Sequence, residues 1–205
     1  TVSDQYPYST YSKIEYEQER KNINYIRNSV KVIINAYDGD MKFYITDRTD
    51  PIIMSYLKLY PTIFSDYTGE EIPEEVKSQF KYPEMLYKIQ SQMLMVYHNV
   101  KEDVLYRNSD IWALATYGTS TSKSKKAVLE PYGAMIKTSD GENYELGLIQ
   151  MYTQEGKSNI TSYLVGTVDG TKCELRIYKY PTESNILGPS QLDNPIEKDE
   201  TISAE

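Results

Sequence analysis

Apolar and polar residues alternate along residues 30–36, and this period-two pattern predicts a β-strand. Asp38 and Gly39 follow, and both tolerate the positive φ angles that a two-residue hairpin turn requires. The alternation resumes along residues 41–45, so the two runs predict a hairpin. A turn of this length pairs Tyr37 with Asp40 and places three pairs on one apolar face: Ala36 with Met41, Ile34 with Phe43, and Val32 with Ile45.

Asp50 and Pro51 predict the start of a helix, because aspartate is a favoured N-cap and proline suits the first helical position. Pro61 then ends this predicted helix. Three further segments also predict helices: 73–80, 83–97 and 101–108. We therefore expect a helical region over about residues 51–108.

The C-terminal half returns to strand patterns. Alternating runs occupy four segments: 132–138, 144–153, 162–168 and 172–181. Asp-Gly pairs at positions 38, 140 and 169 each lie between such runs, which is typical of antiparallel hairpins. The pattern predicts an α+β fold, an antiparallel β-sheet built from Asp-Gly hairpins with the helical insertion packed on one face.

The chain is expected to form a single α+β domain over residues 1–205. Residues 1–27 show little periodicity and predict an extended segment followed by a mobile loop, with 11–24 flexible. Residues 116–128 are rich in Ser, Thr and Lys and are also expected to be flexible. Residues 193–205 carry five acidic residues and one lysine, which predicts an acidic solvated tail or a truncated helix.

Charge and cysteine content exclude several classes of function. The net charge of −8 and the pI near 4.9 argue against nucleic acid as a partner, since phosphate binding requires clustered Lys and Arg. The chain has one cysteine, Cys173, so it cannot form an internal disulfide or a thiolate metal cluster. No apolar run approaches the roughly 20 residues that cross a bilayer, so we expect this piece to be soluble.

No complete catalytic or metal-binding motif is present in the sequence. A calcium loop counted from Asp38 would need Gly at its sixth position and Glu at its twelfth, but Phe43 and Thr49 stand there. A looser carboxylate site that joins Asp38 or Asp40 to Asp50 is an alternative to turn and cap roles. His98 is the single histidine, and its expected role is a bond to a carbonyl at the helix end near residue 97. We predict no catalytic residue, no metal and no cofactor.

Tyrosine is the unusual component, with 21 copies against 3 Phe and 1 Trp. A tyrosine combines an apolar ring with a hydroxyl, so it suits half-buried positions, interfaces and sugar-stacking platforms. The tyrosines are spread along the chain between positions 6 and 180. This spread favours core edges and strand faces over a single aromatic cluster.

Five blocks occur in a characteristic order: "DQYPYS", "INYIRNSVKVIINAYDGDMKFYITDRTDPI", "FKYPEMLYKIQSQMLMVYH", "LYRNSDIWAL" and "LGPSQLDNPIEKDETIS". They strongly resemble consecutive blocks of Uncharacterised Protein Family 0182, a group of large bacterial and archaeal membrane proteins. The resemblance implies a parent with several transmembrane helices near its N-terminus and a large extracytoplasmic region. This chain resembles an internal fragment of that region. The resemblance carries over no catalytic residue.

Most polar residues in these blocks already have a structural explanation as turns or helix starts. The residues that lack one form a predicted binding site: Arg27, Asn28, Lys31, Tyr82, Glu84 and His98. The resemblance and the missing motifs favour a non-catalytic interaction module on the extracytoplasmic face of the cell membrane. Its expected partners are the rest of the parent membrane protein and other envelope proteins or polymers.

Two alternatives remain open from the sequence. The first is an envelope enzyme or carbohydrate-binding domain in which Tyr82, Trp112 and a carboxylate line a cleft. The second is a purely structural part of the parent, whose exposed surfaces other segments cover. An open groove with facing carboxylates favours the first, and a broad tyrosine patch favours the interaction module.

Overall fold

The structure is a computed structural model that describes residues 1–7, 12–16, 19–64, 72–107, 109–118, 127–137, 142–181 and 183–197. It divides into two compact units. The first comprises Thr1–Leu86 and Val168–Lys172, and the second comprises Tyr87–Thr167 and Cys173–Glu205. Antiparallel strands and a few helices make up both units, so the predicted α+β class is confirmed.

The predicted hairpin is present in the first unit, but its register differs from the prediction. Strand β5 (Val30–Ile34) pairs with β6 (Met41–Ile45), and the ladder closes at Asn35, whose N–H donates to the Asp40 carbonyl over 2.8 Å. The loop therefore contains four residues, with Gly39 at φ +77°. Val32 pairs with Phe43 instead of Ile45. A shift of two residues keeps side chains on the same faces, so the apolar face is as predicted.

Helix α1 (Pro51–Leu59) covers one part of this apolar face. Asp50 caps it as predicted, accepting the Ile52 N–H over 2.9 Å, and the helix ends before Pro61. The core beneath it consists of Ile45, Ile53, Leu57 and Phe64. Val32, Ile34 and Met41 on the same face remain exposed.

The N-terminal segment contains strand pairs that the sequence analysis does not predict. Strand β1 (Val2–Ser3) pairs with β4 (Tyr25–Ile26), and β2 (Ser12–Tyr16) pairs with β3 (Glu19–Ile23). Helix α2 (Glu74–Lys77) follows Pro73 and is shorter than predicted.

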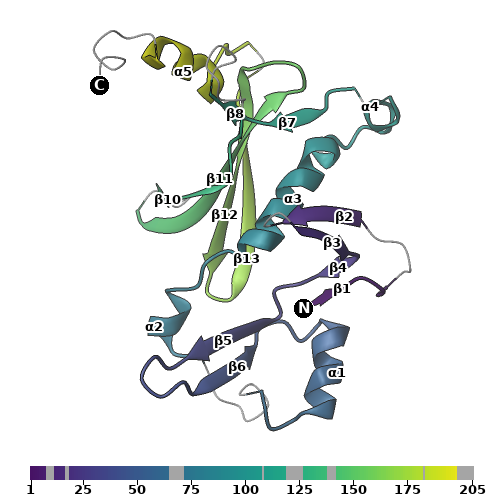
Figure 1. The fold of residues 1–205 in the computed structure, drawn as a ribbon, viewed down its shortest axis with the longest axis vertical. Helices are drawn as coiled ribbons and strands as arrows, with labels where there is room; N and C mark the ends of the chain where they lie inside the picture. The colour runs from purple at the N-terminus through teal and green to yellow at the C-terminus, as the bar shows by residue number, and fades with distance from the viewer. Residues whose placement is uncertain are drawn as a thin grey trace. The chain divides into compact units, whose positions relative to one another are not determined.

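A five-stranded antiparallel sheet dominates the second unit (Figure 1). Its main path runs in the order β10, β11, β12, β13, and β7 also pairs with β11. The bounds of its strands are Trp112–Leu114 for β7, Tyr132–Lys137 for β10, Tyr144–Gln154 for β11, Ile160–Asp169 for β12 and Lys172–Lys179 for β13. All four strands predicted in the C-terminal half are therefore present. The Asp140–Gly141 turn lies outside the described residues, and Gly170 occupies the β12–β13 turn with φ +57°.

The remaining elements are short, apart from one long helix. They are α3 (Glu84–Tyr97), α4 (Glu102–Tyr106), the strand pair β8 (Thr116–Tyr117) and β9 (Ala127–Val128), and α5 (Pro189–Glu197). Helix α5 begins upstream of the acidic end of the chain, and residues 198–205 lie outside the described ones. No described helix is both long enough and apolar enough to cross a membrane.

Helix α3 packs against one face of the sheet through buried tyrosines. The Tyr87 hydroxyl donates to the Leu164 carbonyl over 2.8 Å, and the Tyr152 hydroxyl donates to the Ser91 carbonyl over 3.0 Å. Both rings are fully buried. Because side chains alternate along a strand, the neighbours of Tyr152, such as Met151, point to the opposite face.

Candidate functional site

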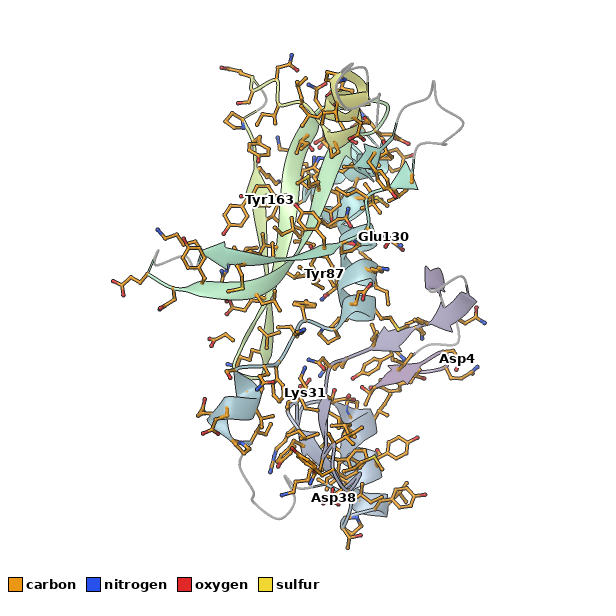
Figure 2. All side chains as sticks on the ribbon, turned by 60° about the vertical axis from the view of Figure 1, so that its left-hand side comes forward. Asp4, Lys31, Asp38, Tyr87, Glu130 and Tyr163 are labelled. Atoms are coloured by element: carbon orange, nitrogen blue, oxygen red, sulfur yellow. The ribbon has the colours of Figure 1, made fainter. Side chains whose placement is uncertain are left out.

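The face of the sheet away from α3 holds a pocket of about 490 Å³. We call it the tyrosine pocket, and its lining residues are Tyr132, Met135, Ile136, Lys137, Ile149, Met151, Tyr163, Val165, Tyr178 and Tyr180. Figure 2 shows Tyr163 on the side of the sheet away from α3. A pocket of this volume falls in the range of small-ligand sites.

Strand register brings the lining residues together. Tyr132 on β10 pairs with Ile149 on β11, which in turn pairs with Val165 on β12. Met151 pairs with Tyr163 in the same way, so these side chains share one face. The aliphatic side chains form a floor, and tyrosines contributed by both outer strands of the main path stand around it.

The tyrosine rings contact one another. Tyr163 stacks on Tyr178 with ring centroids 4.9 Å apart and planes only 10° from parallel. Tyr180 lies 5.9 Å from Tyr163 at an angle of 46°. The Tyr180 N–H donates to the Thr161 carbonyl over 2.9 Å, which fixes the end of β13 beside the pocket. The aromatic wall is therefore held by ring packing and by backbone hydrogen bonds.

Two hydroxyl groups of this lining, those of Tyr132 and Tyr163, are neutral donors. Burial raises the pKa of Tyr132 above 10.0, and the nearby Tyr180 raises it further. Burial also raises the pKa of Tyr163, with contributions from Tyr180 and Tyr178. Near neutral pH both phenols keep their protons and can donate a hydrogen bond to a ligand.

A compact ion cluster lies on the same face of the sheet. Arg176 bonds Glu145 over 2.7 Å and Glu174 over 3.0 Å. The hydrogen bonds from these two carboxylates raise the pKa of Arg176, so its charge is fixed. Among the lining residues of the tyrosine pocket, Lys137 is the charged one.

The predicted site residue Arg27 lies in a polar network of the first unit. Its guanidinium bonds the Asp47 carboxylate over 3.1 Å and the Thr49 hydroxyl over 2.8 Å. Hydrogen bonds from Thr49 and Arg27 lower the pKa of Asp47. Asp47, for which the sequence gives no local role, therefore anchors Arg27.

Asp50 is the centre of a second polar network in the first unit and is fully buried. Its carboxylate accepts hydrogen bonds from the Tyr25 hydroxyl over 2.9 Å and from the hydroxyls of Ser29 and Thr1. Burial alone would raise the pKa of Asp50, but these hydrogen bonds and the Ile52 N–H lower it to about 2. Burial raises the pKa of Tyr25 to about 12, and the hydrogen bond to Asp50 contributes to the same shift. Four donors satisfy Asp50, as expected of a structural carboxylate.

The other predicted site residues of the first unit differ in exposure. Asn28 is half-buried, and its carbonyl accepts the Thr46 hydroxyl over 3.2 Å. The ammonium of Lys31 lies 4.9 Å from the centre of the Phe80 ring. Tyr82 is buried, and Glu84 is exposed in the first turn of α3. That these residues form one binding site stays a prediction.

His98, the remaining predicted site residue, lies in the second unit. Its ring stacks on Trp112 at 3.7 Å, and Nδ1 lies 3.1 Å from the Leu94 carbonyl at the end of α3, as expected. Its Nε2 lies 3.5 Å from the carboxylate of Asp110, which has a positive φ of 62°. The His98 side chain is almost fully covered, and Trp112 is buried against Tyr152, on the face opposite the tyrosine pocket.

Metal binding finds no support in the part of the chain that the structure describes. That part contains no group of three His, Cys, Asp or Glu side chains placed to hold a metal ion. Asp38 caps its own turn by accepting the Asp40 N–H over 2.9 Å. Asp38, Asp47 and Asp50 therefore have local structural roles.

Sequence reasoning missed the tyrosine pocket as a site. The sequence feature that could have indicated this pocket is the spacing of Tyr178 and Tyr180, which lie two residues apart at the end of a predicted strand. Tyr163 lies on the predicted strand before it. The sequence predicts that tyrosines lie on strand faces. Whether tyrosines of different strands meet in one pocket depends on which strands pair. Tyr82 and Trp112 do not line the tyrosine pocket, and the cleft that the carbohydrate alternative places at these two residues stays a prediction.

Comparison with known proteins gives consistent matches. The model of the Uncharacterised protein family (UPF0182) matches residues 1–205. A UPF0182 protein of Desulforamulus reducens is 37% identical over 204 residues, which cover 99% of this chain and 21% of that protein. A UPF0182 protein of Trichodesmium erythraeum is 33% identical over 216 residues, which cover 99% of this chain and 23% of that protein. A UPF0182 protein of Methanospirillum hungatei is 32% identical over 204 residues, which cover 99% of this chain and 22% of that protein.

The chain spans about a fifth of the length of the curated relatives that it matches. No solved structure matches it.

Proposed function

Because the chain belongs to the uncharacterised protein family UPF0182 and spans about a fifth of its relatives' length, we propose that it is a non-catalytic binding module of a larger membrane protein. The module lies on the extracytoplasmic side of the membrane, as the sequence resemblance implies. Its binding site is the tyrosine pocket, and its partners are the rest of the parent protein or other components of the envelope.

One observation carries this proposal. Four tyrosines surround an aliphatic floor on a sheet face, and helix α3 packs on the opposite face. Tyr132 and Tyr178 keep more than a third of their surface exposed, although ring packing holds Tyr178 in place. Rigid, half-exposed aromatic side chains are typical of interaction sites, since binding them costs little side-chain entropy.

The chemistry of the pocket favours binding over catalysis. The described residues that line it include no carboxylate, imidazole or thiol that could serve as a general base or nucleophile. Two carboxylates on this face, those of Glu145 and Glu174, are both bound to Arg176. A proton-transfer role at this pocket would require breaking these ion pairs, so its geometry favours binding over catalysis there.

Photo-crosslinking tests whether the tyrosine pocket is occupied. The photoreactive residue p-benzoylphenylalanine is placed at position 178 of the full-length protein in cells. We expect irradiation to give a discrete covalent adduct, because a ligand in the pocket must contact the Tyr178 ring. The matched control places the same residue at position 106, where Tyr106 is 92% exposed on α4. Equal adducts at the two positions, or none at either, would contradict the proposal.

Thiol labelling tests the extracytoplasmic location separately. Cys173 is half-buried, so it is first replaced by Ser, and Tyr106→Cys then introduces one exposed thiol. We expect a membrane-impermeant maleimide to label this thiol in intact cells as fully as in lysed cells. Labelling only after lysis would show that the module faces the cytoplasm.

A further inference from the structure

The surroundings of the tyrosine pocket favour an uncharged ligand. Lys137 contributes one positive charge at the lining. On the same face, Arg176 contributes a second, and Glu145 and Glu174 contribute two negative charges. Lys172, two residues before Glu174 on β13, shares this face by strand alternation, so the described charges are of mixed sign and the pocket offers no strong single-sign field that would attract an anionic or cationic polymer.

The polar groups of the lining distinguish between two uncharged ligand classes. A sugar ring carries several adjacent hydroxyls, each of which needs a partner once it leaves water. Planar amide and carboxylate side chains pair such hydroxyls two at a time, but the described lining residues include neither type. The phenols and Lys137 would pair only part of a sugar's hydroxyls, and those over the floor of Ile149, Met151 and Val165 would stay unpaired, which disfavours a glycan.

A proline-rich strand in the polyproline II conformation matches the same lining. Its proline rings are apolar and lack N–H donors, while its backbone carbonyls project as acceptors. Aromatic grooves bind such segments by packing on the rings, and phenol hydroxyls can donate to the carbonyls. Tyr132 and Tyr163 keep their hydroxyl protons, so they supply these donors.

The dimensions agree with a short segment. Tyr132 on β10 and Tyr178 on β13 stand three strand spacings apart in the sheet order, which is about 14 Å. Polyproline II rises about 3.1 Å per residue, so about five residues would cross the pocket.

A site of this size binds weakly unless its ligand is held nearby. About four-fifths of the length of the relatives lies outside the region that matches this chain. A segment of the same polypeptide is present at millimolar effective concentration when a short flexible connection links it to the site. A tethered segment can therefore occupy a pocket that a free peptide would fill only partly.

We propose that the tyrosine pocket binds a proline-rich extended segment from another part of the same full-length protein. This inference rests on the proposed function and specifies the ligand of its binding site. The bound segment fixes this module against the rest of the parent through stacking on Tyr163 and Tyr178.

Identification of the adduct at position 178 tests the inference. After irradiation of the full-length protein, mass spectrometry of the digested adduct is expected to identify a peptide of the same polypeptide with several prolines. An excess of free decaproline peptide should reduce the adduct in detergent extracts, whereas cellohexaose should not. Tyr163→Ala should reduce the adduct about tenfold, as expected for loss of an aromatic anchor. Tyr106→Ala is the matched control and should leave it unchanged.

The outcomes separate this inference from the proposed function. Attachment to another protein, to a glycan, or to a peptide of the same chain without prolines would overturn the inference and leave the pocket as a binding site. Absence of any adduct would overturn both. Tyr163→Phe keeps the ring, so it should retain most of the adduct. Equal losses in the Phe and Ala variants would contradict stacking as the source of binding.

Discussion

Replacing Asp50 with alanine is expected to lower the free energy of unfolding by about 3 kcal/mol. The change removes the side-chain cap of α1, which accepts the Ile52 N–H. It also leaves the buried hydroxyl of Ser29 and that of Tyr25 without their acceptor. Each loss is a recognised source of destabilisation. Chemical denaturation measures the change.

Asp40→Ala provides the matched control for this prediction. Asp40 is exposed and lies in the same hairpin segment, so its replacement should change stability by about 0.5 kcal/mol or less. If the two aspartate variants were equally stable, Asp50 would not be the structural centre of this region.

The pH dependence of stability provides an independent test of the same carboxylate. The folded-state pKa of Asp50 is about 2, below its ordinary value of 3.8, so the unfolded chain binds this proton more readily. The contribution is therefore complete above about pH 5 and is mostly lost as the pH falls to 2, a loss of about 2 kcal/mol. Asp50→Asn cannot ionise and should show a smaller loss of stability over this interval. Parallel pH profiles for the two proteins would contradict this assignment.

Replacing Gly188 with alanine is expected to destabilise the second unit by about 3 kcal/mol. Gly188 is buried at the start of α5, and an added Cβ would overlap the carbonyl oxygen of Ser158. Because that atom belongs to the backbone, the clash cannot be relieved by a change of rotamer. Gly188 also donates its N–H to Gln191 over 2.8 Å, which fixes its position.

Gly133→Ala is the control for the glycine prediction. An added Cβ at Gly133 would lie 3.8 Å from Leu146 Cδ1, an ordinary contact, so stability should stay the same or rise slightly. Thermal or chemical denaturation of both variants measures the difference. Equal free energies of unfolding for the two variants would show that the segment at residue 188 does not pack against Ser158.

Local patterns predicted most of the regular elements. Period-two runs identified β5, β6 and the strands from β10 to β13, because one face of each carries apolar residues. The Asp50-Pro51 pair marked the start of α1, because a cap and a fixed φ act within a few residues. Such signals are local, so a single sequence is enough to detect them.

Features that depend on pairing between distant residues were not predicted. The hairpin register was wrong by two residues, because the Asn35–Asp40 pair closes a loop that the Asp-Gly signal alone does not specify. The partner of β1 is β4, more than twenty residues later, and no alternation marks either strand.

The tyrosine pocket shows the same limit at the level of the site. Tyr163 and Tyr178 lie on neighbouring strands, and Tyr132 joins them only because β10 pairs with β11 on the same face. The sequence shows 21 tyrosines but not which of them share a face. Tyr87 and Tyr152 have a structural role instead, since their hydroxyls donate to backbone carbonyls inside the core.

The most direct test of the tyrosine pocket as a binding site compares photo-crosslinking at positions 178 and 106 of the full-length protein in the same cells. The pocket lining predicts a discrete adduct at position 178 that Tyr163→Ala reduces, and no comparable adduct at position 106. Matching adducts at the two positions, or an adduct at 178 that is insensitive to Tyr163→Ala, would contradict a binding role for the tyrosine pocket.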